Sequence, residues 1–411
     1  MIQPPAPSNL LFSIVAGLVF SISITLPASA EEKNPNAPEL VAVTDGNVTM
    51  RLKSGRIMTI EMSRLSPAEQ EYAKAWAAEH PDATIAHEPP VIEDTLNFDD
   101  PWPDKIRFSD DLQIETVEED REAKRFIYES ANFRFNVDVR LSPTVVKGFA
   151  LMFEATQLYC RTLPLGISGG EKKNGKYQVL LFETKRDYIK AGGPPSSAGV
   201  FISGPGRNVV MVPLTSLGVR PVGSGYMLDR DKANGTLVHE ITHQLTPSCY
   251  FTQGPRGWFS EGIAEYVTAT RYRSGSFTPR TILSDAEDYA TAYGRDHQGG
   301  RSLGKEITAP PLKDFLMMSY ADFAGPAANF NYGFGLILTT YFLHLDGEGD
   351  GIRMKNFLKG LHEGKTGQSA IDILLDGRSY ADMEEAITKA WKRKGVEIDF
   401  TGSVQSAPNK Y

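Results

Sequence analysis

The sequence GTLVHEITHQLTP, at residues 235–247, predicts a short buried helix beyond the middle of the chain. Its apolar residues would share one helical face and pack against other elements: Leu237, Val238, Ile241 and Leu245. Pro247 lacks a backbone N–H and is expected to end the helix. The same helix carries His239, Glu240 and His243, so its packing would hold three chemically active side chains in place.

His239 and His243 are four residues apart, a spacing that brings two side chains together on a helix. Their imidazole nitrogens could therefore bind one metal ion. Glu240 would project beside that metal, where a carboxylate can hold a bound water molecule. Two surface histidines on an ordinary helix are the alternative interpretation.

A second segment, WFSEGIAEY at residues 258–266, supplies a cluster of carboxylates. Glu261 and Glu265 are four residues apart and share one face of a helix expected to continue to Arg271. The gap from His243 to Glu261 is long enough for one helix to end and a second to pass alongside. A catalytic zinc site needs a third protein ligand and an open position, and this cluster is expected to supply that ligand.

The two segments together resemble the gluzincins, the zinc peptidase superfamily of thermolysin and the aminopeptidases. HEITH is followed by WFSEGIAEY, which matches the WxxEGxAEY pattern of that superfamily. The resemblance extends over residues 124–397 and is closest to small exported peptidase-like domains. It implies an α+β metallopeptidase domain, in which a mixed sheet and the metal-binding helix precede a C-terminal helical subdomain.

The resemblance also implies a role for each matching residue. One zinc ion would be bound by His239, His243 and Glu261. Glu265 would accept the other N–H of His239 and so fix its tautomer; a plain solvated carboxylate is the alternative. Glu240 would act as the general base on a water molecule whose pKa zinc lowers to about 7.

An oxyanion that forms on a scissile carbonyl needs a hydrogen-bond donor in addition to the metal. By family position Tyr332 is the first candidate for this donor, and Tyr266 and His297 are the next candidates. The alternative role for Tyr332 is packing on a helical face. In domains of this kind an edge strand binds substrate by backbone pairing. Residues 198–201 or 209–212 could form that strand.

Hydrophobic patterns around these segments predict an α+β fold. Strands are expected at 126–128, 133–139, 177–182, 198–203 and 209–212, with a helix at 143–163. Helical patterns then predominate, at 332–345, 353–362, 369–375 and 380–394. Strands followed by helices in this order are typical of an α+β domain.

Residues 39–80 form a separate small module. Two predicted strands, at 48–52 and 57–62, precede a capping box at Ser66–Glu69 and a helical run. The sequence DGNVTMRLKSGRIMTIEMSRLSPAEQEY resembles the SH3-like homology domain of endocytic adaptor proteins. A structural spacer and a ligand-binding module are the two interpretations.

The other segments have simpler compositions. Residues 1–30 contain the apolar run LLFSIVAGLVFSISITL and the small-residue site Ala28-Ser29-Ala30, which predict a signal peptide. Export outside the cytoplasm follows, with no stable membrane insertion after cleavage; an uncleaved N-terminal anchor is the alternative. The acidic, proline-bearing residues 81–123 predict an extended linker, and residues 398–411 a flexible tail.

Two whole-chain properties bear on compartment and partners. Cys160 and Cys249 are the only cysteines, and in an oxidising compartment they could form one disulfide or remain two separate thiols. The formal net charge of -8 argues against nucleic-acid partners, which need a basic surface.

The leading hypothesis is a zinc peptidase that hydrolyses peptide or protein substrates outside the cytoplasm. A catalytically inactive zinc-binding scaffold with the same fold is the first alternative, and a zinc hydrolase of non-peptide substrates is the second. The complete set His239, Glu240, His243 and Glu261 favours an active enzyme. The sequence indicates no particular substrate, endo- or exopeptidase action, or oligomeric state.

Overall fold

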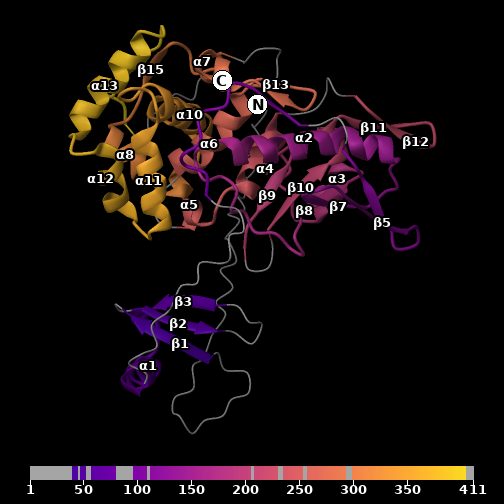
Figure 1. Ribbon diagram of the computed structural model, residues 1–411, viewed down its shortest axis with the longest axis horizontal. Coiled ribbons are helices and arrows are strands. Elements are labelled where there is room, and N and C mark those ends of the chain that lie inside the picture. Colours follow the sequence, from indigo (N-terminus) through magenta and orange to yellow (C-terminus); the bar gives the residue numbers. More distant parts are fainter. Residues whose placement is uncertain are drawn as a thin grey trace, which may run out of the picture. The chain divides into compact units, whose positions relative to one another are not determined.

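The computed structural model describes residues 39–44, 47–51, 57–79, 96–108, 112–204, 208–229, 235–252, 257–292 and 299–403. The chain divides into two compact units, Met1–Val91 and Ile92–Tyr411 (Figure 1). The predicted signal peptide and His297 lie outside the described residues. No helix within the described ranges is long and apolar enough to cross a membrane.

The N-terminal unit contains a three-stranded antiparallel sheet followed by a helix. Its elements are β1 (Glu39–Thr44), β2 (Asn47–Arg51), β3 (Ile57–Glu61), the 3₁₀ turn η1 (Met62–Arg64) and α1 (Pro67–Glu79). Val48 and Met50 alternate along β2 and are fully buried, as expected for one face of a strand. The capping box is present, because the Ser66 N–H donates to Glu69 and the Glu69 N–H donates to the Ser66 hydroxyl.

The C-terminal unit is built on a six-stranded mixed sheet. In spatial order the strands are β5 (Glu115–Asp120), β6 (Arg125–Glu129), β7 (Phe133–Val137), β8 (Tyr177–Phe182), β10 (Val209–Pro213) and β9 (Val200–Ile202). β7, β8 and β10 run parallel, whereas β5, β6 and β9 pair antiparallel with their neighbours. The expected hairpin of β9 and β10 is present, and β9 is the strand at the edge.

Helix α2 (Pro143–Thr162) connects two parallel strands, β7 and β8, and covers the sheet. Ser142 caps its first turn and Pro143 occupies the position where no N–H is needed. Its Phe149 and Phe153 meet Phe135 edge to face, with ring centroids 5.3 and 5.1 Å apart. These buried aromatic contacts fix the helix to the sheet.

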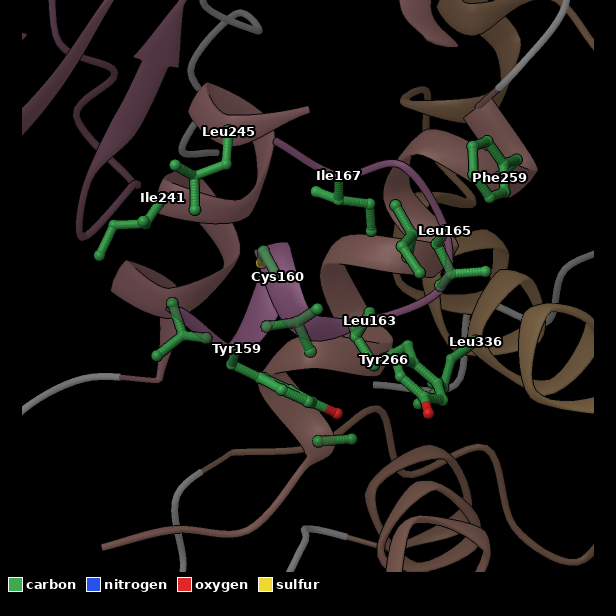
Figure 2. Close-up of a cluster of buried hydrophobic side chains, with 14 of the residues drawn as sticks. Tyr159, Cys160, Leu163, Leu165, Ile167, Ile241, Leu245, Phe259, Tyr266 and Leu336 are labelled. Atoms are coloured by element: carbon green, nitrogen blue, oxygen red, sulfur yellow. The ribbon is translucent and has the colours of Figure 1, made fainter. Parts of the chain in front are cut away.

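Three further helices lie side by side between the sheet and the C-terminal helices (Figure 1). They are α4 (Thr236–Leu245), α6 (Gly257–Ala269) and α10 (Ala328–His344). α4 packs against α2 and the strands β9 and β10, α6 packs against α4, and α10 packs against α6. Figure 2 shows Ile241 and Leu245 of α4 in the same apolar cluster as Cys160, Leu163 and Phe259. The apolar face of α4 therefore packs as expected, and this packing holds His239 and His243 in place.

Additional helices complete the unit on the side away from the sheet. Among the described residues they are α5 (Cys249–Thr252), α7 (Ile282–Thr291), α8 (Leu312–Leu316), α9 (Tyr320–Phe323), α11 (Ile352–His362), α12 (Gly367–Leu375) and α13 (Tyr380–Lys392). α3 (Lys185–Lys190) lies beside β8 and β10, and β11 (Val219–Val222) pairs with β12 (Gly225–Leu228) as a hairpin. The predicted α+β class is confirmed.

Two predicted boundaries differ from the structure. Within the expected linker, residues 115–120 form β5, because their backbone pairs antiparallel with β6, and residues 106–107 form β4 beside β14 (Ser276–Phe277). Within the expected tail, β16 (Glu397–Asp399) pairs parallel with β15 (Glu306–Thr308). The acidic and polar composition of these segments does not predict strands. The short strands form because each pairs with a strand distant in the sequence.

The two cysteines are separate thiols and are not joined by a disulfide. Cys160 is fully buried under α4 (Figure 2), and burial raises the pKa of its thiol to about 12. Cys249 begins α5, where its Sγ lies 3.5 Å from His362 Nδ1. The two side chains thus belong to different surroundings.

The close crossing of α6 and α10 depends on glycine. A Cβ at Gly262 would lie 2.6 Å from the Gly335 carbonyl oxygen, which is backbone and cannot turn away. We expect Gly262→Ala to lower the free energy of unfolding by about 1–3 kcal/mol, because it forces the helices apart. Chemical denaturation measures this, with Gly225→Ala as the control, because a Cβ at Gly225 meets nothing within 4 Å. Equal stability of the two variants would contradict the close crossing.

Candidate metal centre

Three side chains from two helices converge on one point. His239 and His243, on successive turns of α4, place their Nε2 atoms 3.0 Å apart. Glu261 Oε2, from α6, lies 3.0 Å from His239 Nε2 and 3.1 Å from His243 Nε2. All three side chains are buried, with 7%, 8% and 3% of their residue surface exposed. The structure thus brings together the three residues expected as metal ligands.

The donor atoms fit a divalent cation. Zinc ligands lie about 2.0–2.2 Å from the metal, and an ion at that distance from all three atoms fits over a triangle of this size. His239 Nδ1 faces the Glu265 carboxylate, so in the neutral imidazole Nε2 carries the lone pair. Lone pairs of two imidazoles and a carboxylate oxygen repel one another unless positive charge lies between them. A cation held by His239, His243 and Glu261 would supply that charge.

Glu265 lies where the resemblance places it. Its Oε1 is 2.9 Å from His239 Nδ1, and only 1% of its surface is exposed. On its other side it accepts hydrogen bonds from the guanidinium of Arg301. Glu265 therefore orients the His239 ring from behind and is itself held by a cation.

The local electrostatics favour positive charge at this point. Burial alone would lower the pKa of His239, but Glu261 and Glu265 outweigh it and raise that pKa to about 10. Burial alone would raise the pKa of Glu265, but His239 and Arg301 outweigh it and lower that pKa to about 2. The carboxylates are thus kept ionised in the interior, where a proton or a metal ion on the imidazoles is stabilised.

Glu240 occupies the space between the histidines and the edge of the sheet. Its Oε2 accepts a hydrogen bond of 2.6 Å from the backbone N–H of Phe201 in β9. Burial raises the pKa of Glu240, and the nearby imidazoles and the Phe201 N–H only partly offset this. A carboxylate with a raised pKa is better matched to accepting a proton near neutral pH.

Tyr332 lies at the site as well, on the first turns of α10. Its ring stacks on His239, with centroids 6.1 Å apart and planes 21° from parallel. Burial and the charge of Glu261 raise the pKa of its hydroxyl, which keeps it protonated as a donor. The structure thus places Tyr332 beside the metal ligands while it also packs against Phe323. Its position shows the packing role, and the role as an oxyanion donor stays a prediction.

Tyr266, the second candidate for the oxyanion donor, points elsewhere. It is fully buried, and its hydroxyl lies 2.8 Å from His344 Nε2. Figure 2 shows it within the apolar cluster, near Tyr159 and Leu336. Its place on α6, one residue after Glu265, turns it to another face of the helix. Tyr266 is therefore a core residue.

Two residues of the site, Tyr320 and Arg301, were not predicted from the sequence. The Tyr320 hydroxyl, from the four-residue helix α9, donates to Glu261 Oε1 over 2.9 Å, while 54% of Tyr320 is exposed. Arg301 comes from the segment after α7 and reaches Glu265. Neither position carries a local pattern, because both contacts join segments that are distant in sequence.

A comparison with protein-family models and with curated proteins finds no match for this chain.

Proposed function

We propose that this protein is a zinc-dependent hydrolase of peptide bonds. The observation that carries the proposal is the position of Glu240, which directly follows the ligand candidate His239 on α4 and accepts a hydrogen bond from the edge strand β9. The cluster supplies three protein ligands, and a three-ligand zinc site keeps a position for water or substrate. An edge strand can bind an extended peptide by backbone pairing. Together these features support peptides as the substrate class.

The roles of the residues follow from their positions. When bound by His239, His243 and Glu261, zinc would polarise a carbonyl group and lower the pKa of water to about 7. Glu240 would accept the proton of the attacking water and deliver it to the leaving amine. Glu265 would hold the His239 ring in the orientation needed for metal binding.

Two tyrosines are the candidate donors to the developing oxyanion. Tyr332 stacks on His239, and the hydroxyl of Tyr320 already contacts Glu261. Burial raises the pKa of both hydroxyls, so each stays protonated and able to donate a hydrogen bond. Tyr332 remains our first candidate. Tyr320 is the alternative that the tertiary structure adds: 54% of the residue is exposed, but its hydroxyl lies against the buried Glu261.

The proposal extends to the rest of the chain. HEITH and WFSEGIAEY support our proposal of a gluzincin-type domain, and the structure adds the coarser fact that an α+β fold carries both segments. The apolar run and small-residue site within residues 1–30 support action outside the cytoplasm. An SH3-like module remains our interpretation of residues 39–80, supported by their sequence.

Metal analysis and a peptide-library digest test the proposal. We expect the purified chain to contain one equivalent of zinc and to cleave peptide bonds, as seen by mass spectrometry of the products. A chelator should abolish cleavage, and added zinc should restore it. A zinc-loaded protein that cleaves no peptide would contradict the proposal and favour the inactive scaffold or a non-peptide hydrolase.

A further inference from the structure

Arg301 contacts two different parts of the metal centre. Its Nε donates to Glu265 Oε2 over 2.8 Å, and its Nη2 donates to Glu265 Oε1. Its Cζ also lies 4.9 Å from the centre of the Tyr332 ring. The planar guanidinium suits both contacts, because it forms paired hydrogen bonds with a carboxylate and stacks on an aromatic face.

The two side chains that the Arg301 guanidinium contacts, Glu265 and Tyr332, also lie against His239. Glu265 Oε1 is 2.9 Å from His239 Nδ1, and the Tyr332 ring stacks on the imidazole. Glu265 therefore determines which nitrogen of His239 faces the metal, and Tyr332 restricts rotation of the ring. Arg301 thus restrains the His239 imidazole through two residues, Glu265 and Tyr332.

The backbone of Arg301 is held on both sides. Its N–H donates to the Tyr289 carbonyl at 2.8 Å, and its carbonyl accepts from Asn329 Nδ2 at 2.9 Å. A Cβ at Gly333 would lie 2.8 Å from Arg301 Cβ, so glycine at that position of α10 leaves the space that Arg301 uses. The side chain is thereby aimed at Glu265 by contacts with α7 and α10.

We propose that Arg301 is a positioning residue, which fixes Glu265 and Tyr332 against His239 and thereby sets the metal affinity of the site. Arg301 acts through these two residues and not on a substrate. The inference rests on the metal site of the proposed function and is independent of peptide hydrolysis. A structural ion pair would stabilise the fold, whereas a positioning residue also changes how strongly the site holds zinc.

Zinc affinity of the full chain, measured by competition with a chromophoric chelator, tests the inference. Removal of a group that orients a metal ligand typically weakens metal binding about 10–100-fold, and we expect this of Arg301→Met. Arg301→Lys keeps the charge but not the paired geometry, so its loss should be smaller. It also serves as the test variant if the methionine variant does not fold.

The matched control is Arg271→Met. Arg271 also pairs with a buried carboxylate, Asp285, at 3.3 Å, but neither residue contacts a metal ligand. We expect this control to retain the zinc affinity of the unchanged protein. Equal zinc affinities for the variants at positions 271 and 301 would overturn the inference.

A double variant shows whether Arg301 acts through Glu265. In a Glu265→Gln background, Arg301→Met should weaken zinc binding by clearly less than it does alone, because the route through Glu265 is already lost. The visible spectrum of the cobalt(II)-loaded protein should change in Arg301→Met and not in Arg271→Met. Fully additive losses of zinc affinity, with an unchanged cobalt spectrum, would overturn the inference.

The outcomes for the two proposals are distinguishable. Zinc binding that depends on Arg301, in a protein that cleaves no peptide, supports the inference and contradicts the proposed function. Peptide cleavage by a protein whose zinc affinity does not depend on Arg301 supports the proposed function and contradicts the inference. Absence of zinc binding by the unchanged chain overturns both.

Discussion

Glu240→Gln is expected to lower peptide hydrolysis by about 10²–10⁴-fold without loss of zinc. The amide has nearly the same shape, and its oxygen can still accept the hydrogen bond from the Phe201 N–H. It cannot accept a proton, so the attacking water is no longer activated. Initial rates on a cleaved peptide, together with zinc content per chain, measure the two effects separately.

An exposed glutamate provides the matched control for this substitution. Glu348 lies in the turn after α10, and Glu348→Gln makes the same chemical change at the surface. We expect its rate and zinc content to equal those of the unchanged protein. A Glu240→Gln protein that hydrolyses peptides at the normal rate would remove Glu240 from the mechanism, whereas loss of its zinc would show a structural role instead.

His243→Gln is expected to abolish zinc binding at ordinary metal concentrations, and with it hydrolysis. Four ligands of a structural zinc site share about 10–16 kcal/mol, so one ligand accounts for an affinity change on the order of 10²–10³-fold. Binding at 100 times the dissociation constant stabilises a protein by about 2.7 kcal/mol, and the variant should lose this gain. Thermal unfolding with and without zinc measures the difference.

His344→Gln is the control for that experiment. His344 Nε2 contacts the Tyr266 hydroxyl, and glutamine can keep a hydrogen bond there without touching the ligand cluster. We expect the control to be stabilised by zinc as the unchanged protein is. A His243→Gln protein that zinc still stabilises by the full amount would place the metal elsewhere in the chain.

Local pattern was sufficient for the longest helices of the C-terminal unit and for five of the six strands of its main sheet. The 143–163 prediction corresponds to α2 and the 177–182 prediction to β8, because continuous or periodic apolar residues reveal which face of a segment is buried. Elements with few residues or polar composition were missed, among them β5 and α9. Their backbone pairs or packs only because partners from other parts of the chain lie beside them.

Two of the three ligand candidates could be chosen from the sequence for a geometric reason. His239 and His243 are one turn apart on one helix, so their proximity follows from helix geometry alone. Glu261 could be identified only from the second motif, because local helix geometry does not determine how α6 packs against α4. The structure brings its carboxylate to 3.0 Å from His239 Nε2.

Residue types and their spacing are enough to specify the chemistry of the site: two imidazoles and an adjacent carboxylate on a helix with an apolar face, and further carboxylates on a later helix. The other side chains that complete the site are specified by the packing of elements distant in sequence. Arg301 reaches Glu265, Tyr320 reaches Glu261, and Tyr266 turns into the core. Spacing along a helix specifies neighbours within one element, whereas contacts between elements depend on how buried faces pack.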